Sequence, residues 1–336
     1  MPKDEALANM LSVNRLSMRK WRGGEDYDGL ANALNMSRLA DGVDDFLETP
    51  GNLKELFDKP KSFDPDRDAT IIEREGRIVG LCLVRHEERP NGDIAFIHSV
   101  ELTPDVRRDG VRRELFLFNE RHAKEASCRV TSKPIEKQAL LLWANDEPNE
   151  WMDIVKVSGY EPVQHVLSMV RPLDDFPEVA LPKGFEIRPV PPVKYEVVWS
   201  ARRTACIGEW DFSEEEWDKR HFEKWMRSEE FQPELWQVAW HGDTIAGMIL
   251  NFILQSENEG FKRRRGHTEH VFVREQFRRR GLARALLAKS FRVLREHGVE
   301  EAALDTEVEN PNETVRLYGS MGFKVSKRFT WYRKPL

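Results

Sequence analysis

A tight basic turn is the segment of this sequence whose residue types could most directly do chemistry. It lies between an alternating segment that ends at Val273 and an amphipathic helix, and it reads Arg278-Arg279-Arg280-Gly281-Leu282-Ala283-Arg284. Successive N–H groups at a helix start, backed by the positive end of the helix dipole, form a cradle for a pyrophosphate. Small side chains at Gly281 and Ala283 would let phosphates approach the backbone. The turn predicts a phosphate site, although taken alone a purely structural strand-to-helix turn explains it equally well.

Acidic and aromatic residues upstream of the turn could bind a cation. Glu209 and Asp211 flank Trp210, and further tryptophans stand at Trp199, Trp217 and Trp225. Such a rim suits a cationic amine, for example an aminosugar, a polyamine or a peptide amine. Aromatics at helical spacing more often belong to a core, so both interpretations stay open. The basic run 262–265 has a similar pair of interpretations, namely a solvated hairpin tip or a contact to a phosphate or an acidic acceptor.

The elements that must position these residues alternate between strands and helices. In the second half we expect helices at 282–296, at 313–321 and after a capping box at 213–216, and strands at 185–190, 235–240, 244–254, 267–273, 301–308 and 323–332. The first half repeats this order, with a helix at 112–126 and strands at 70–75, 78–85, 94–102, 138–143 and 163–170. Each sheet is expected to be completed by the last strand of its own half.

An internal repeat supports two copies of one unit. Residues 149–160 align with residues 312–323, and each stretch is followed by an alternating segment that ends in Arg-Pro-Leu or Arg-Lys-Pro-Leu. Between the copies, residues 174–184 contain Pro177 and Pro182, a composition typical of a linker. We therefore predict domains at 1–173 and 185–336.

Composition excludes several classes of protein. At 336 residues the chain is about twice the length of a typical domain. A net charge of -6 does not favour nucleic acid as a partner. No apolar run approaches the roughly 18 residues of a membrane span, and the first residues do not resemble a signal peptide, so we expect a cytoplasmic protein with no membrane partner. Three widely spaced cysteines without a CxxC pair predict no metal site.

The basic turn and a second segment together resemble the GNAT superfamily of N-acetyltransferases. The family signature Arg/Gln-x-x-Gly-x-Gly/Ala is matched by Arg278-x-x-Gly281-x-Ala283, and the second signature by Asn310-Pro311 through Leu317-Tyr318 to Gly322-Phe323. The resemblance is strong over 185–336 and weak over 17–173, and the two-copy layout resembles the mycothiol synthase type. It implies a mixed α/β fold of two tandem GNAT-type domains, each a central mixed, mostly antiparallel sheet flanked by helices.

The resemblance also implies a co-substrate and its binding residues. Acetyl-CoA would lie between the strands 267–273 and 301–308, without a metal. Carried over by position, the pantetheine arm would contact the strand end and the pyrophosphate would contact the turn. The residues so assigned are Val271, Phe272, Val273, Arg278, Arg279, Arg280, Gly281, Leu282, Ala283, Arg284 and Asn310.

The implied reaction is direct attack of an amine on the thioester in a ternary complex, which needs a proton acceptor and a proton donor. Tyr318 matches the family tyrosine that protonates the coenzyme thiolate, with a core tyrosine as the alternative. Where many GNAT enzymes have a glutamate base, this chain has His267, and strand alternation puts Glu269 on the same face. Either could accept the proton, or both could be ordinary polar residues. A backbone N–H near Val271 would hold the oxyanion.

The first copy departs from the pattern. Its turn reads Arg107-Arg108-Asp109-Gly110-Val111-Arg112, and Val155 occupies the position of Tyr318. We expect a scaffold there, although some tandem relatives keep a non-reacting acetyl-CoA. The predicted function is N-acetyl transfer to a small-molecule amine that contacts Glu209, Trp210 and Asp211, by a monomer or homodimer. A peptide or protein N-acetyltransferase and a non-catalytic acyl-CoA-binding module remain the alternatives.

Overall fold

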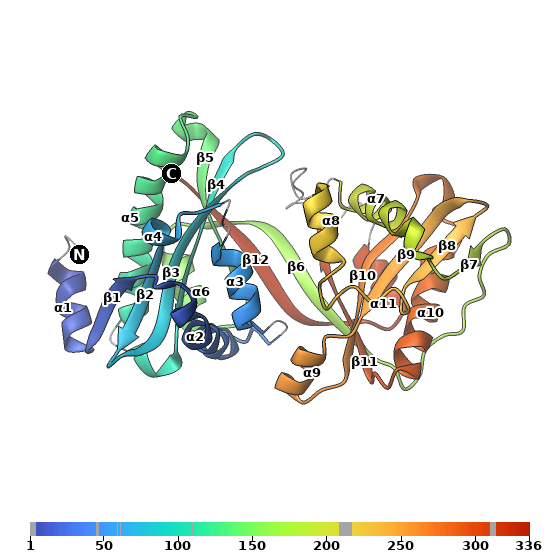
Figure 1. Ribbon diagram of the computed structural model, residues 1–336, viewed down its shortest axis with the longest axis horizontal. Helices are drawn as coiled ribbons and strands as arrows, with labels where there is room; N and C mark the ends of the chain where they lie inside the picture. Colours follow the sequence, from blue (N-terminus) through green and yellow to red (C-terminus); the bar gives the residue numbers. More distant parts are fainter. Residues whose placement is uncertain are drawn as a thin grey trace. The chain divides into compact units, whose positions relative to one another are not determined.

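The chain forms two compact units in the computed structural model, shown in Figure 1, which describes residues 5–44, 47–58, 60, 62–108, 110–207, 217–309 and 314–336. Unit 1 contains residues 1–163 together with 330–336, and unit 2 contains residues 164–329. Each unit has its own hydrophobic clusters and its own run of consecutive strands in the strand order.

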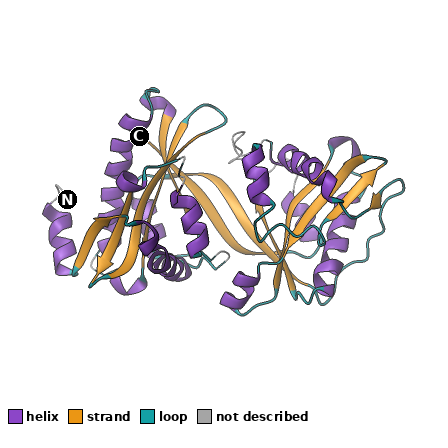
Figure 2. Ribbon diagram, viewed as in Figure 1, coloured by secondary structure: helices purple, strands orange, loops and turns teal. Residues whose placement is uncertain are grey.

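Unit 1 is a sheet with helices on both faces. Its strands are β1 (Leu16–Lys20), β2 (Ala69–Arg74), β3 (Arg77–Glu88), β4 (Ile94–Leu102) and β5 (Gln138–Asn145), and its helices are α1 (Glu5–Val13), α2 (Tyr27–Ala40), α3 (Pro50–Asp58), α4 (Pro65–Asp68), α5 (Val111–Val130) and α6 (Glu150–Val157). The strands lie in the order β1-β2-β3-β4-β5, and only the β4–β5 pair is parallel. Helices α1, α5 and α6 lie on one face of the strands and α2 and α3 on the other (Figure 2), and apolar residues of these helices pack against the strands.

Unit 2 repeats this plan. Its strands are β7 (Glu186–Ile187), β8 (Gln237–His241), β9 (Thr244–Phe252), β10 (Arg265–Val273) and β11 (Glu301–Glu307), and its helices are α7 (Tyr195–Cys206), α8 (Lys219–Trp225), α9 (Gln255–Phe261), α10 (Leu282–Glu296) and α11 (Thr314–Ser320). The order is β7-β8-β9-β10-β11, and only the β10–β11 pair is parallel. Helices α10 and α11 pack on one face, and α7 and α8 pack on the other. Both units therefore confirm the predicted mixed, mostly antiparallel α/β fold.

The sequence explains the helix that follows the basic turn. Leu282, Leu286 and Leu294 recur on one stripe of α10, and all three are at most 1% exposed, while arginines occupy the opposite side. The bounds of α10 agree with the predicted 282–296. The predicted capping box at 213–216 lies outside the described residues. Instead, the Asp218 carboxylate accepts a hydrogen bond of 2.9 Å from the His221 N–H at the start of α8.

The last strand of each half of the chain also lies beside a strand of the other half. β6 (Glu161–Pro172) pairs antiparallel with β11 of unit 2, from Glu301 opposite Pro172 to Glu307 opposite Val166. β12 (Lys324–Pro335) lies between β5 and β6 in the strand order, and its residues from Thr330 onward belong to unit 1, whereas those before belong to unit 2. The expectation that 163–170 completes the first sheet and 323–332 the second differs from the structure, because alternation predicts a strand but does not predict its partner.

The predicted linker 174–184 lies inside unit 2. Phe176, Val179 and Leu181 pack against the cluster that contains α10, and the guanidinium of Arg295 lies 4.6 Å from the centre of the Phe176 ring. The bounds of the two compact units, 1–163 with 330–336 and 164–329, therefore differ from the predicted domain bounds 1–173 and 185–336. Within the described ranges, no helix is long and apolar enough to cross a membrane.

Candidate active site

The basic turn of unit 2 presents backbone N–H groups at the start of α10. A short 3₁₀ turn, Glu275–Phe277, follows β10, and Gly281 then adopts a left-handed conformation with φ 84° and ψ 1°. The first helical hydrogen bond of the turn runs from the Ala285 N–H to the Gly281 carbonyl at 3.1 Å. The N–H groups of 282–284 precede that bond, so they point out of the helix end as donors for an anion.

Side chains around the turn leave this helix end accessible. A Cβ built on Gly281 would meet no heavy atom within 4 Å, so this position needs glycine for its positive φ rather than for space. The arginines Arg278, Arg279, Arg280 and Arg284 are exposed. The Nε–H of Arg278 donates to the Val273 carbonyl at 3.0 Å, which ties the turn to the end of β10. Ala283, in the first turn of the helix, is small and only partly buried.

Strands β10 and β11 separate next to this turn. Their parallel pairing runs from Arg265 opposite Glu301 to His267 opposite Ala303 and then ends, although both strands continue. A bulge between Glu269 and Phe272, with His270 at φ 52°, bends β10 away while its other edge stays paired with β9. The backbone N–H and C=O groups of 271–273 on the edge that faces β11 therefore lie past the last residue pair of the β10–β11 ladder. This opening and the adjacent N–H cradle fit the pantetheine arm and pyrophosphate of acetyl-CoA. Asn310 lies outside the described residues.

The structure places His267 in a buried polar contact. His267 is 5% exposed, its Nε2 lies 3.1 Å from Glu257 Oε2, and its ring stacks on Phe252 with centroids 4.9 Å apart. Glu257, on α9, also accepts from Arg263. Burial opposes ionisation of Glu257, but the hydrogen bonds and positive charges of His267 and Arg263 hold its pKa below the usual value.

Three arginines of the basic run 262–265 form ion pairs with glutamates of the same unit. Besides the Arg263–Glu257 pair, Arg264 pairs with Glu300, and the Nε of Arg265 lies 2.8 Å from Glu301 Oε1. The run joins α9 to β10 rather than forming a hairpin tip.

Glu269 and Asp305 are in contact at the point where β10 and β11 separate. The Asp305 N–H donates to Glu269 Oε1 at 3.3 Å, and the Ser168 hydroxyl of β6 donates to Asp305 Oδ1 at 2.6 Å. More than a third of the Asp305 surface is open to solvent, and neighbouring protein atoms remove part of the hydration of its carboxyl group. This desolvation raises the pKa of Asp305, helped by the negative charge of Glu257 and opposed by Ser168, His267 and Arg265. A partly desolvated carboxyl group that solvent still reaches is suited to exchange protons with a ligand.

Arg202 of α7 makes cation–π contacts with a group of tryptophans on the face of unit 2 that α7 and α8 cover. Its guanidinium carbon lies between 5.2 and 5.5 Å from the ring centroids of Trp199, Trp217 and Trp225. Its Nε–H also donates to His270 Nε2 at 2.8 Å. Burial and the charge of Arg202 lower the pKa of His270 well below its usual value, so His270 stays neutral. An internal cation thus already contacts these rings. Glu209, Trp210 and Asp211 lie outside the described residues.

Tyr318 lies on α11, on the opposite face from Glu257 and Arg202. It is 5% exposed, and its ring packs against Phe323 with centroids 6.0 Å apart. The hydroxyls of Thr306 and Thr314 lie 2.8 Å apart and connect the start of α11 to β11.

Sequence reasoning missed Ser168, Arg202, Glu257, His270 and Asp305. Asp305 had a signal in the sequence, because it directly follows the apolar run Ala302-Ala303-Leu304 within a strand, at a position whose side chain faces away from α10. No feature of the sequence indicated Ser168, because Ser168 lies beside Asp305 only through the pairing of β6 with β11.

The two repeated units, each with separating parallel strands followed by a turn and a helix, are the arrangement expected of tandem GNAT-type domains. The chain belongs to the acetyltransferase (GNAT) family, whose model matches residues 36–140 and 200–323. The predicted family is confirmed, and with it an acyltransferase activity and acetyl-CoA as the co-substrate that this family uses.

Relatives and solved structures agree with the two-copy layout. The mycothiol acetyltransferase of Streptomyces bingchenggensis (strain BCW-1) is 25% identical over 271 residues, which cover 78% of this chain and 84% of that protein. A GCN5-related N-acetyltransferase from Sphaerobacter thermophilus has a TM-score of 0.66 at 23% identity, with 95% of each chain covered. A tandem GNAT protein from the clavulanic acid biosynthesis pathway has a TM-score of 0.64 at 15% identity, covering 95% of this chain and 98% of that one.

Proposed function

We propose that unit 2 transfers an acetyl group from acetyl-CoA to a primary amine of a small molecule, by direct attack in a ternary complex. The observation that carries this proposal is the partly desolvated carboxyl group of Asp305, which lies with Glu269 where β10 and β11 separate. The similarity to a mycothiol acetyltransferase over most of both chains supports a small-molecule acceptor.

Asp305 and Glu269 act as the proton acceptors. An amine must lose a proton as its nitrogen bonds to the acetyl carbon, and a carboxylate within reach, directly or through one water, takes up that proton. Asp305 is the stronger candidate because its surroundings raise its pKa. His267 is the weaker one, because Glu257 engages its Nε2. We assign His267 a structural role, in which its contact with Glu257 stabilises the face of β10 on which Glu269 also lies.

Acetyl-CoA supplies the thioester that makes the acetyl group reactive. As the carbon–sulfur bond breaks, Tyr318 gives its phenolic proton to the leaving sulfur, which departs as a neutral thiol. The backbone N–H near Val271 stabilises the negative charge on the carbonyl oxygen. The N–H groups of Leu282, Ala283 and Arg284, with the side chains of Arg278–Arg280, hold the pyrophosphate.

A thiol-release assay with acetyl-CoA tests this function across a panel of amines. The panel contains aminoglycosides, polyamines, cysteinyl pseudodisaccharides and peptides with free N-termini, and Gly281→Glu is the control that blocks the cradle. We expect amine-dependent thiol release by the wild type with at least one small-molecule amine and none by Gly281→Glu. Release with peptides alone would replace the small-molecule acceptor by a peptide or protein. No release with any amine, or equal release by Gly281→Glu, would contradict the proposal.

A further inference from the structure

The backbone of unit 1 repeats the coenzyme cradle of unit 2. A 3₁₀ turn, Pro104–Val106, follows β4, and Gly110 adopts φ 74° and ψ 15° before α5, close to the values of Gly281. The Nε–H of Arg107 donates to the Leu102 carbonyl at 2.9 Å, as Arg278 does to Val273 at 3.0 Å.

The parallel strands of unit 1 also separate. β4 and β5 pair from Ile94 opposite Gln138 to Ile97 opposite Leu141, and both strands then continue unpaired with each other. The backbone alone would therefore offer unit 1 the same kind of opening as unit 2.

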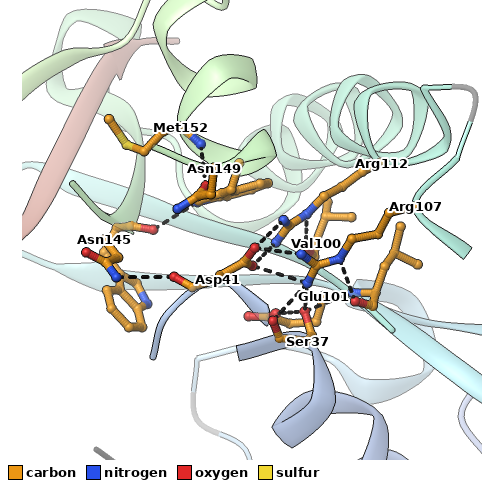
Figure 3. Close-up of polar contacts among 12 residues, drawn as sticks. Ser37, Asp41, Val100, Glu101, Arg107, Arg112, Asn145, Asn149 and Met152 are labelled. Atoms are coloured by element: carbon orange, nitrogen blue, oxygen red, sulfur yellow. Dashed lines mark hydrogen bonds and ion pairs between the residues drawn. The ribbon is translucent and has the colours of Figure 1, made fainter. Parts of the chain in front are cut away.

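One side chain makes the difference between the two openings. Ala283 of unit 2 corresponds to Arg112 of unit 1, which is 1% exposed. The guanidinium of Arg112 does not extend into solvent but turns inward, where its Nε–H donates to the Val100 carbonyl at 3.3 Å (Figure 3). Val100 is the counterpart of Val271, one of the residues assigned to the pantetheine arm.

Asp41, which follows α2, fixes Arg112 in this position. The Nη1 and Nη2 groups of Arg112 donate to Oδ1 and Oδ2 of Asp41 at 2.9 and 2.5 Å, and Arg107 donates to Asp41 Oδ1 at 2.7 Å (Figure 3). At the end of β5, Asn145 Nδ2 donates to the Asp41 carbonyl at 3.2 Å. The guanidinium also lies 4.8 Å from the Trp151 ring of α6. The Arg112–Asp41 pair thus contacts the Val100 carbonyl of β4, Asn145 at the end of β5 and Trp151 of α6.

We infer that the Arg112–Asp41 pair closes the unit 1 counterpart of the coenzyme channel, so that the chain binds one acetyl-CoA, in unit 2. The inference rests on the proposed function only for the chemical class of the ligand. A ligand entering this opening would have to displace a bidentate pair whose partners are both nearly buried, and a displaced buried charge without its partner is strongly unfavourable. Acetyl-CoA therefore fits the residues of unit 2 and does not fit those of unit 1.

Calorimetric titration with acetyl-CoA tests the inference through four forms of the full chain. We expect one site in the wild type and none in Gly281→Glu. Arg112→Ala opens the channel while Asp41 keeps Arg107 as its partner, so this variant should show a second site with a Kd of about 1 mM or tighter. Arg113→Ala removes an exposed arginine of the same helix and should keep the wild-type stoichiometry.

Folding of each variant is checked by its thermal unfolding midpoint. If Arg112→Ala does not fold, the double variant Asp41→Ala/Arg112→Ala removes both charges and is titrated in its place. Two sites in the wild type, or a site that survives Gly281→Glu, would overturn the inference, as would a single site in a folded variant without Arg112. A wild type that binds no acetyl-CoA would instead contradict the function proposed for unit 2, so the two failures are distinguishable.

Discussion

Asp305 is the residue whose surroundings most directly predict a pH dependence. Its carboxyl group must be ionised to accept a proton, and burial raises its pKa in the folded chain. Activity should therefore be retained above the pKa of Asp305 and fall as the pH drops through it, and this pKa lies above the usual value of an aspartate. Asp305→Asn cannot accept a proton, and kcat should fall by about 10²- to 10⁴-fold.

The matched measurement is a pH profile of kcat/KM for both forms of the protein. Because asparagine carries no charge to desolvate, the thermal midpoint of Asp305→Asn at pH 8 should not lie below that of the wild type. A variant with unchanged kcat and an unchanged acidic limb would remove Asp305 from the reaction.

Tyr318→Phe removes one hydroxyl and keeps the ring that packs against Phe323. If Tyr318 protonates the leaving sulfur, kcat should fall by about 10²- to 10⁴-fold while the Kd of acetyl-CoA stays within about twofold. Tyr332→Phe makes the same change in unit 1, where Tyr332 packs against the core, and should leave kcat unchanged. Equal activity of the two variants would show that Tyr318 only packs.

At the scale of elements, the two turns offer a matched pair of glycines. Gly281 and Gly110 both have positive φ, and a Cβ on either would meet no heavy atom within 4 Å. Alanine at each position should therefore cost only conformational free energy, about 1 kcal/mol of stability. Gly281→Ala should also weaken acetyl-CoA binding by distorting the cradle, whereas Gly110→Ala should not. Thermal unfolding and calorimetry measure both effects, and equal loss of affinity in the two variants would contradict the assignment of the coenzyme to unit 2.

Strand β6 contributes Ser168 to the proposed site although it comes from the first half of the chain. Its hydroxyl donates to the Asp305 carboxylate and so lowers the pKa of Asp305. In Ser168→Ala that stabilisation of the ionised form is lost, the pKa of Asp305 rises, and the acidic limb of kcat/KM should move to higher pH. Ser326→Ala removes a neighbouring hydroxyl that donates to the Ser168 carbonyl and should leave the limb in place. Identical profiles for both variants would show that Ser168 does not act on Asp305.

The sequence predicted elements better than it predicted their partners. The stripe of leucines defined α10 to the residue, and the alternation of 94–102 defined β4. The pairing of β6 with β11 was not predictable, because alternation would fit either sheet equally well. The same limit hid the site: His267 and Glu269 could be placed on one face from spacing, but Glu257 and Ser168 reach that face through tertiary structure alone.

At the scale of the whole molecule, the two halves of the chain are interlocked by their last strands. β6, from the first half, forms a continuous ladder with β11, and each backbone hydrogen bond in it contributes about 0.5–1.5 kcal/mol. From the second half, Lys334 donates to Glu120 at 2.7 Å, and Tyr332 and Leu336 pack against the core of unit 1. Unit 1 is therefore completed by residues 330–336 from the end of the chain, and unit 2, residues 164–329, includes most of the last strand of the first half.

Cutting the chain between the halves tests this interlocking. A protease site inserted between Lys183 and Gly184, both exposed, leaves β6 on one fragment and β11 and β12 on the other. Because each fragment supplies a strand to the other's unit, the cleaved halves should co-elute in size-exclusion chromatography and still bind acetyl-CoA. They should separate only in denaturant, and they should unfold at a lower temperature than the intact chain, since association of two pieces adds a concentration-dependent cost. Two fragments that elute apart while the second alone binds acetyl-CoA would show that the C-terminal half completes its own sheet, and that Ser168 is not needed to hold Asp305.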